Sequence, residues 1–201
     1  MKKIGVLGGT FDPIHYGHLF VAENARHTFG LDEILIIPAA RPPHKLDSVT
    51  ANAEHRLNMV RLAAEGNGGF CVCDAELRRG EVSYTVDTMT ELCTLHPDDE
   101  LYCIIGEDSL IQLPTWKRFS ELAKLVKFIS VNRFERGAEA INEAVQRLSE
   151  LYGAEIYTVT LPLVEFSSSD IRRRVKDGLP IKYMLPEAVE RYIAENRLYT
   201  D

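Results

Sequence analysis

Short apolar runs alternate with segments of helical spacing from one end of the chain to the other. Six runs have the length and composition of strands, and several are nearly all apolar, as strands buried on both faces are. They are Lys3–Leu7, Glu33–Pro38, Phe70–Asp74, Leu101–Ile105, Lys127–Val131 and Glu155–Val159. Between them, apolar residues recur at helical spacing, as at Val86, Met89, Leu92 and Cys93, and at Ile141, Ala144, Val145, Leu148 and Leu151. This alternation predicts an α/β fold in which helices cover a parallel sheet.

The chain ends in a segment of helical character. Pro186 suits a first-turn position, and one face of the helix after it would carry Ala188, Val189, Tyr192 and Ile193. No internal repeat or low-complexity linker interrupts the 201 residues, of which 45% are apolar and 26% charged. This composition is typical of a globular protein. We therefore expect one domain over residues 1–201, with a helical C-terminal portion over residues 167–201.

The formal charge of −7 is spread without long runs of like charge. Such a surface does not attract nucleic acid or anionic lipid by bulk electrostatics, so we expect neither partner. No stretch approaches the roughly 18–20 apolar residues of a membrane span, and the glycine-broken N-terminus predicts a strand rather than a signal peptide. The four cysteines have neither CxxC nor zinc-knuckle spacing, which favours buried thiols in a reducing compartment. We expect a cytoplasmic protein.

The segment after the first strand, GGTFDPIHYGH, has the outline of a phosphate site. In parallel sheets, ligands bind outside the carboxyl ends of the strands. Gly8 and Gly9 let the backbone approach an anion closely, and the following helix offers unpaired N–H groups with a partial positive charge. The segment matches neither GxGxxG nor the P-loop pattern, which argues against a dehydrogenase-type dinucleotide site and a Walker ATPase.

His15 and His18 stand three residues apart at the start of that helix, where both can face one bound group. A metal-binding pair is one interpretation, but a zincin needs HExxH, and HYGH has neither that spacing nor the glutamate. Donation to phosphate oxygens explains two histidines beside a glycine-rich turn better, and the Thr10 hydroxyl can add to the same group. We therefore expect no metal ligation by these residues.

The segment GGTFDPIHYGHL resembles the opening motif of the nucleotidyltransferases that share an HxGH element. In its extended form it is similar to the bacterial nicotinate mononucleotide adenylyltransferase family, for which GTFDP in front of HxGH is highly specific. The resemblance runs from Lys3 to Arg172 with every motif in order. It implies a Rossmann-like, doubly wound parallel sheet. It also implies an enzyme of NAD biosynthesis that transfers the adenylyl group of ATP to nicotinate mononucleotide, giving nicotinate adenine dinucleotide and pyrophosphate.

The resemblance assigns ATP to three loops. It implies that His18 donates to the α-phosphate side, and that the β- and γ-phosphates are held by His15, Thr10 and Arg172. The catalytic set is His18, His15 and Arg172, and the ATP-binding set is Gly8, Gly9, Thr10, Gly106, Asp108, Ser168 and Arg172. In FSSSDIR, serines suit a helix cap, but an arginine in the first turns opposes the helix dipole unless a phosphate binds there. Glu107 departs from the family's pattern, which has a small residue at that position.

The resemblance assigns a second set of residues to the acceptor, namely Lys45, Tyr84, Thr85, Trp116 and Lys117. The RPPHK loop would place Lys45 beside the acceptor phosphate. SYTVDT suits a helix start, which capping alone would explain, but the family implies that Thr85 and neighbouring amides hold the nicotinate carboxylate while Tyr84 lines the pocket. We expect Trp116 at the start of a short helix, stacked on the pyridine ring, with the amide of Lys117 also taking the carboxylate.

No Ser–His–Asp or Cys–His order is apparent, and the transfer does not need one. A phosphate monoester is mostly dianionic at neutral pH, its second pKa being about 6, so it can attack the α-phosphorus without a general base. Mg²⁺ is expected to arrive with ATP, held by phosphates and waters. Two alternatives stay open: a phosphopantetheine adenylyltransferase, which usually has Thr in place of His15 and lacks the PPHK, SYTxDT and Trp elements, and a non-catalytic nucleotide-binding sensor. The sequence also leaves open a homo-oligomer and the degree of preference for nicotinate over nicotinamide mononucleotide.

Overall fold

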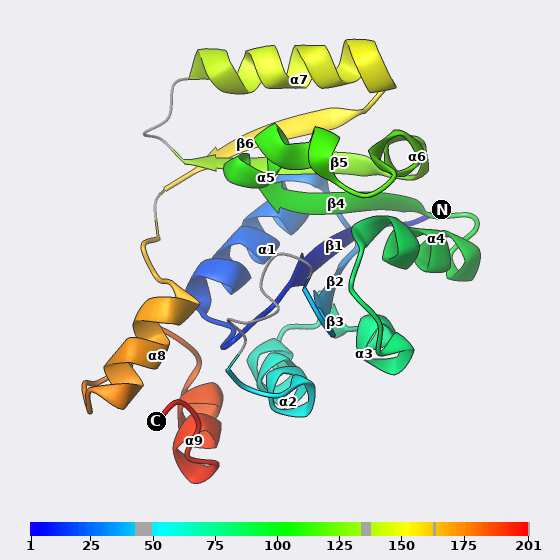
Figure 1. The fold of residues 1–201 in the computed structure, drawn as a ribbon. Coiled ribbons are helices and arrows are strands. Elements are labelled where there is room, and N and C mark those ends of the chain that lie inside the picture. Colours follow the sequence, from blue (N-terminus) through cyan, green and yellow to red (C-terminus); the bar gives the residue numbers. More distant parts are fainter. Residues whose placement is uncertain (43–49, 134–137, 163, 201) are drawn as a thin grey trace. The chain divides into compact units, whose positions relative to one another are not determined.

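The computed structural model of the protein describes residues 1–42, 50–133, 138–162 and 164–200. Within these ranges, the strands form one sheet of order β3-β2-β1-β4-β5-β6 (Figure 1). They are β1 Lys3–Gly9, β2 Glu33–Pro38, β3 Phe70–Val72, β4 Glu100–Gly106, β5 Lys127–Arg133 and β6 Ile156–Leu161. The β1–β4, β4–β5 and β5–β6 pairs are parallel. The predicted α/β architecture is confirmed, and each predicted strand end lies within two residues of the observed one.

Helices connect the strands, and most of them follow the predicted alternation. They are α1 Tyr16–Phe29, α2 Ala53–Ala64, α3 Ala75–Arg79, α4 Thr85–Leu95, α5 Glu107–Gln112, η1 Leu113–Thr115, α6 Phe119–Leu125, α7 Ala138–Tyr152, α8 Ser168–Lys176 and α9 Glu187–Glu195. Pro186 is the N-cap of α9, one position before the first-turn place that the sequence suggested. Across the described ranges, no helix has the length and apolar character needed to cross a membrane.

The chain divides into two compact units. The first comprises Met1–Leu7, Val21–Leu35 and Tyr84–Leu163, and the second comprises Gly8–Phe20, Ile36–Ser83 and Val164–Asp201. In the first unit α5 packs on β5 and α7, while α4 packs on α6. In the second unit α2 packs on β3 and α9. The single domain over residues 1–201 stays a prediction.

The central strands are buried because their apolar runs have neighbours on both edges. The side chains of Ile4, Ile34 and Ile36 are fully buried, and those of Leu101–Ile105 in β4 are at most 7% exposed. Strand β6 is more exposed than the central strands, and its Tyr157 is 40% exposed. The reason is topological, since β6 is an edge strand of the sheet. The cysteines differ from expectation: only Cys103 is buried, whereas Cys71, Cys73 and Cys93 are half-buried.

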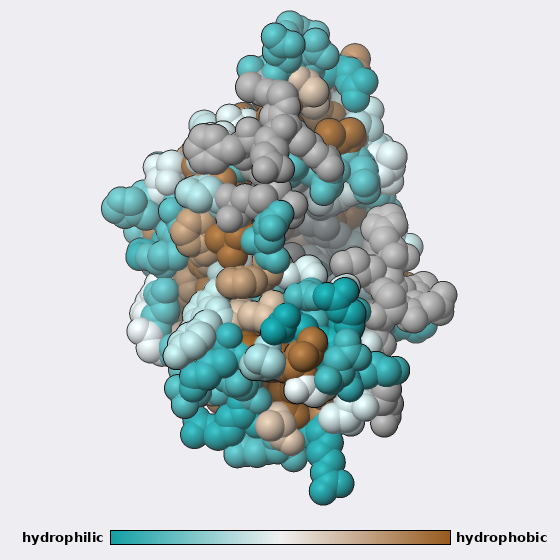
Figure 2. Space-filling model, turned by 90° about the vertical axis from the view of Figure 1, so that its left-hand side faces the viewer, coloured by the Kyte–Doolittle hydropathy of each residue, from teal (hydrophilic) through white to brown (hydrophobic). Residues whose placement is uncertain are grey.

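The strand order reverses at β1 and β4, because the chain first builds outward through β2 and β3 and then returns to the other side of β1. In open parallel sheets, ligands bind at the carboxyl ends of the strands at such a reversal. β1 ends at Gly9 and β4 ends at Gly106, and both glycines belong to the predicted ATP-binding set. After β6, α8 buries Ile171 and exposes Arg173 and Lys176, while Arg172 is half-buried. Figure 2 shows hydrophilic side chains gathered in the region that holds α8 and α9.

Candidate active site

The first loop, between β1 and α1, places the two predicted histidines against each other in the second unit. His15 directly precedes α1 and is 6% exposed. His18 lies in the first turn of α1 and is half-buried. Their rings stack with centroids 3.8 Å apart and 27° between the planes. Phe11 also contacts the His18 ring in an edge-on arrangement, with ring centroids 5.0 Å apart.

A backbone contact fixes which nitrogen of His18 carries the proton. The N–H of His15 donates to Nδ1 of His18 over 3.2 Å. In a neutral imidazole, a nitrogen that accepts a hydrogen bond leaves the proton on the other nitrogen. Nε2 of His18 is therefore a donor, as a phosphate contact requires. The sequence identified His18 but gave no sign of this contact.

His15 is buried as a neutral ring with one nitrogen unsatisfied. Burial lowers the pKa of His15 to about 4, so the ring is uncharged at neutral pH. Among the described residues, no group hydrogen-bonds to its buried Nδ1. An unsatisfied buried polar atom costs about 1–3 kcal/mol, and in native proteins it calls for an explanation such as a bound water, an ion or a catalytic role. This atom fits a residue that completes its hydrogen bonding with a bound molecule.

The first loop has a glycine at three positions, and the physical reason for a glycine differs between them. At Gly17, between the two histidines, a Cβ atom would lie 3.0 Å from Cε1 and Nδ1 of His15, so a larger residue would displace that ring. At Gly9, a Cβ would lie 2.8 Å from the Phe11 ring. Gly8 is exposed, and a Cβ there would meet nothing within 4 Å. The protein itself does not require a glycine at position 8, whereas a closely approaching ligand would.

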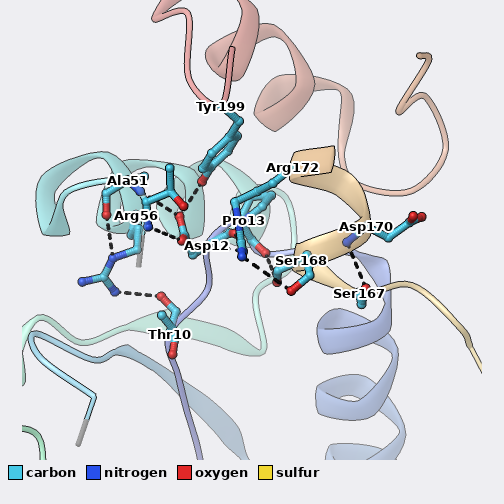
Figure 3. A network of polar contacts seen from close by, with 12 residues as sticks. Thr10, Asp12, Pro13, Ala51, Arg56, Ser167, Ser168, Asp170, Arg172 and Tyr199 are labelled. Atoms are coloured by element: carbon cyan, nitrogen blue, oxygen red, sulfur yellow. Dashed lines mark hydrogen bonds and ion pairs between the residues drawn. The ribbon is translucent and has the colours of Figure 1, made fainter. Parts of the chain in front are cut away.

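Helix α8 docks on the first loop through two of the predicted ATP-binding residues (Figure 3). Ser167 is the N-cap, which confirms the serine cap expected from the sequence. The Ser168 hydroxyl donates to the carbonyl of Pro13 over 2.9 Å, and Nη1 of Arg172 donates to the carbonyl of Asp12 over 2.7 Å. The structure thus brings Ser168 and Arg172 to the loop that carries both histidines.

Asp12 is the centre of a buried network that sequence reasoning missed (Figure 3). Its Oδ2 accepts from the N–H of Thr50 at 2.8 Å, and its Oδ1 accepts from the N–H of Ala51 at 3.1 Å. The hydroxyl of Tyr199 donates to the same Oδ1 over 2.8 Å. Nη1 of Arg172 lies 3.7 Å from Oδ2. Asp12 was part of the recognised motif, but nothing in one sequence pairs it with a residue near the other end of the chain.

Arg56 of α2 is a second missed residue, with only 1% of its surface exposed. Its Nη1 donates to the carbonyl of Thr10 over 2.7 Å, and its Nη2 to that of Ala40 over 3.1 Å. Its Nε donates to the carbonyl of Ala51 over 3.3 Å. Burial lowers the pKa of Arg56, and the Asp12 carboxylate opposes that shift. Arg56 therefore fixes the backbone at Thr10 and at Ala40, next to the RPPHK segment.

In the first unit, three of the predicted acceptor residues form one cluster. Tyr84 is the N-cap of α4 and makes no side-chain capping bond, so Thr85 opens a helix whose first amides lack that cap. Nζ of Lys117 lies 4.0 Å above the centroid of the Tyr84 ring. The same ammonium lies 3.2 Å from Oδ2 of Asp87, and Nη1 of Arg118 lies 3.0 Å from Oδ1. The cation over Tyr84 is thus held by an acid in the first turn of α4.

Trp116 is half-buried, but it does not begin a helix as the sequence suggested. It follows η1 with extended backbone angles, φ −70° and ψ 143°. Pro114 lies within η1, and the N–H of Trp116 closes that turn by bonding to the carbonyl of Leu113 at 3.0 Å. Helix α6 starts only at Phe119, after Arg118 in a left-handed conformation. The indole is therefore carried on a short extended segment between two turns.

Of the remaining predicted site residues, the structure describes all but one. Gly106 is the exposed N-cap of α5, and a Cβ there would meet nothing within 4 Å. Asp108 is exposed, whereas the departing residue Glu107 is 4% exposed. Lys45 lies outside the described residues. In the part of the chain that the structure describes, no three His, Cys, Asp or Glu side chains form a group able to hold a metal ion.

A parallel sheet whose first strand leads into an HxGH loop, with a serine- and arginine-bearing helix docked on that loop, defines a nucleotidyltransferase. The family model described as cytidylyltransferase-like matches residues 6–174, and the chain belongs to this family. A probable nicotinate-nucleotide adenylyltransferase from Thermoanaerobacter sp. (strain X514) is 43% identical over 98% of this chain and 94% of its own. One from Geobacter sp. (strain M21) is 43% identical over 99% of both chains. Identity at this level over both full lengths places the chain among the nicotinate-nucleotide adenylyltransferases.

Solved structures confirm the Rossmann-like fold. Plasmodium falciparum nicotinic acid mononucleotide adenylyltransferase complexed with NaAD has a TM-score of 0.81 at 23% identity, covering 99% of this chain and 98% of that one. The same enzyme complexed with APC has a TM-score of 0.77 at 22% identity, with the same coverage. The fold is therefore shared from end to end with proteins of low sequence identity.

Proposed function

We propose that this protein transfers the adenylyl group of ATP to nicotinate mononucleotide, giving nicotinate adenine dinucleotide and pyrophosphate as a step of NAD biosynthesis. The observation that carries the proposal is the docking of α8, where Ser168 and Arg172 bond to carbonyls of the loop that holds both histidines. This cluster combines a hydroxyl, a guanidinium and two imidazoles with the N-terminus of α1, which suits a triphosphate. The names of the relatives support the acceptor.

The proposal gives the histidines different tasks. The proton on Nε2 of His18 is a preformed donor, and we assign it to the oxygens around the α-phosphorus, where negative charge develops during transfer. Arg172, Thr10 and His15 are assigned to the β- and γ-phosphates. His15 binds as a neutral ring, because burial keeps its pKa near 4. Gly8 leaves open space for the triphosphate to approach the backbone.

The acceptor supplies its own nucleophile. Its phosphate is mostly dianionic at neutral pH and attacks the α-phosphorus directly, so the protein contributes positioning and charge stabilisation. Mg²⁺ would enter as part of the ATP complex, where it would neutralise phosphate charge. Every protein group assigned to the reaction therefore binds, orients or donates a proton in a hydrogen bond.

The acceptor assignment rests on residues of the first unit. Thr85 and the uncapped amides of α4 are assigned to the nicotinate carboxylate, together with the amide of Lys117. Tyr84 and Trp116 are assigned to the pyridine ring, and the Lys117 ammonium is held over Tyr84 by Asp87. A role for Lys45 at the acceptor phosphate and a cytoplasmic location complete the proposal.

The test is pyrophosphate release from purified protein with Mg-ATP and one acceptor at a time. Nicotinate mononucleotide should give the highest kcat/KM, with nicotinamide mononucleotide lower and phosphopantetheine inactive. Turnover of phosphopantetheine alone would establish the phosphopantetheine adenylyltransferase alternative. Tight ATP binding with no pyrophosphate from any acceptor would instead establish the nucleotide-binding sensor.

A further inference from the structure

The C-terminal segment returns to the first loop through one side chain. Tyr199 is the third residue from the end of the chain and is 6% exposed. Its hydroxyl donates to Oδ1 of Asp12 over 2.8 Å, across 187 positions of sequence (Figure 3). The turn after α9 is fixed by a bond from the N–H of Leu198 to the carbonyl of Ile193 at 3.0 Å. The tyrosine thus enters the network at a set position.

The Asp12 carboxylate is already satisfied by neutral donors. Two backbone amides, those of Thr50 and Ala51, and the Tyr199 hydroxyl donate to it at 2.8–3.1 Å. Burial, together with the Asp12 charge, raises the pKa of Tyr199, so its hydroxyl stays a donor at neutral pH. Nη1 of Arg172 lies further away, at 3.7 Å from Oδ2, and its short bond of 2.7 Å is to the Asp12 backbone carbonyl.

This arrangement decides how strongly Asp12 and Arg172 attract each other. A buried carboxylate that lacks neutral donors takes a nearby guanidinium as a direct ion pair, because charge-assisted hydrogen bonds are the stronger ones. Arg172 would then be drawn toward Asp12 and would have to break that pair before it could bind a phosphate. With the three neutral donors in place, Nη1 of Arg172 stays 3.7 Å from Oδ2 of Asp12.

We propose that Tyr199 is a positioning residue for ATP, whose hydroxyl occupies Asp12 and so keeps Arg172 available to the triphosphate. This inference rests on the proposed function, because it assigns Arg172 to ATP phosphates. Tyr199 acts through Asp12 and Arg172 and need not touch the substrate. The role of the hydroxyl can be tested separately from the packing of the ring, because phenylalanine would keep the buried ring and remove only the donor.

The experiment compares Tyr199→Phe with Tyr192→Phe. Tyr192 lies on α9 in the same unit, and its hydroxyl contacts Nδ1 of His55 at 2.9 Å and Nδ2 of Asn58 at 3.1 Å. Tyr192→Phe is therefore the matched control, because it removes a tyrosine hydroxyl that bonds to residues outside the first loop. Each variant is measured by thermal unfolding, by equilibrium titration with Mg-ATP, and by steady-state kinetics for both substrates.

Tyr199→Phe should weaken Mg-ATP binding by about tenfold, the size expected for losing one hydrogen bond to a charged group. Its KM for nicotinate mononucleotide should stay within about twofold of wild type. Tyr192→Phe should lower the melting temperature comparably and leave ATP affinity unchanged. Equal ATP affinity in the two variants, or equal losses for both substrates in Tyr199→Phe, would overturn the inference and leave Tyr199 with packing alone.

A double-mutant cycle tests whether Tyr199 affects ATP binding through Arg172. In an Arg172→Ala background, the added Tyr199→Phe change should cost no further ATP affinity, since the residue it positions is gone. Additive losses would overturn the inference. The proposed function fails separately, because a wild-type protein that releases no pyrophosphate with nicotinate mononucleotide refutes that function while the ATP titrations still report on Tyr199.

Discussion

His15 and His18 are stacked on each other, yet their surroundings give them opposite properties. His18 is half-buried, and its Nδ1 is occupied by the N–H of His15, so its donor proton points elsewhere. His15 is buried, neutral and unsatisfied at Nδ1 within the described residues. The glycine between them is required because a Cβ atom there would press on the His15 ring. The HxGH spacing therefore stacks two histidines of different character, and the glycine of the motif leaves room for that stack.

Removing the His18 ring should slow the chemical step while leaving the fold intact. His18→Ala should lower kcat by about 10²–10³-fold, the usual loss for one preorganised donor to a developing charge. His27→Ala, an exposed histidine at the end of the same helix, is the control and should have wild-type kcat. Wild-type kcat in His18→Ala, measured by pyrophosphate release, would remove His18 from the mechanism.

His15 should make stability depend on pH in acid. Its pKa is about 4 in the folded protein and about 6.5 when exposed, so the unfolded chain binds a proton that the folded chain excludes. The stability present above pH 6.5 should therefore fall progressively as the pH drops toward 4, by up to about 3 kcal/mol. His15→Phe keeps a ring against His18 but cannot titrate. Between pH 6.5 and pH 4, the free energy of unfolding of wild type should fall relative to that of His15→Phe, and a difference that does not change with pH would contradict the burial of a neutral His15.

Gly8 should matter to ATP and not to the fold. A Cβ at this position meets no protein atom within 4 Å, so Gly8→Ala should leave the melting temperature unchanged. It should raise the KM for ATP roughly tenfold, since crowding a close contact typically costs about 1–3 kcal/mol. Gly68→Ala is the matched control, because a Cβ there also meets nothing within 4 Å. Unchanged ATP KM in Gly8→Ala would show that no phosphate approaches this backbone.

The sequence could identify the residues that form local motifs, but not their distant partners. His15, His18 and Gly8 stand within one loop, so their spacing alone indicated a phosphate site. Asp12 and Tyr199 are 187 positions apart, and Arg56 bonds to carbonyls, which carry no sequence signal. The network around Asp12 therefore became visible only in the structure.

Among the elements, α4 and the segment after η1 together shape the proposed acceptor site. Tyr84 caps α4 without a side-chain bond, and Lys117 lies over its ring, fixed by Asp87. Trp116 is carried on extended backbone and is half-buried, so part of the indole is accessible. An indole placed this way can stack on an aromatic ligand.

Trp116→Ala should weaken the binding of nicotinate mononucleotide by about tenfold, because aromatic stacking contributes about 0.5–1.5 kcal/mol. The affinity for ATP should stay unchanged. Trp116→Phe keeps a smaller ring and should lose less. Trp116 is the only tryptophan of the chain, so its fluorescence reports on this segment alone. Titration with nicotinate mononucleotide should quench that fluorescence in a saturable way. An unchanged spectrum at saturating acceptor would place the pyridine ring elsewhere.

The long elements were predictable, and the short helices were not. Strands β1, β2, β4 and β5 are apolar runs with neighbours on both sides, and α7 has a clear helical period. Helices α3 and α6 span five and seven residues, too few for spacing to distinguish a helix from a turn. The segment at Trp116 was expected to start a helix, but Arg118 adopts a left-handed conformation and delays α6 to Phe119.

At the scale of the whole molecule, the order of strands and the order of motifs agree. The sheet reverses at β1 and β4, and each of these strands ends on a glycine of the predicted ATP-binding set. This relation was predictable in outline, because alternating strands and helices imply a parallel sheet with ligands at the carboxyl ends. The return of the C-terminal segment to Asp12 was not predictable, since helical periodicity says where α9 packs its apolar face but not where the chain ends.

The central claim is that the α-phosphorus of ATP passes directly to the acceptor phosphate. It is tested most directly by a single-turnover reaction of protein in excess over ATP labelled with ³²P at the α-position, with and without nicotinate mononucleotide. The account predicts that the label appears in nicotinate adenine dinucleotide only when the acceptor is present, and that none stays on denatured protein. Label on the protein before acceptor is added, or label that remains in ATP with the acceptor saturating, would contradict it.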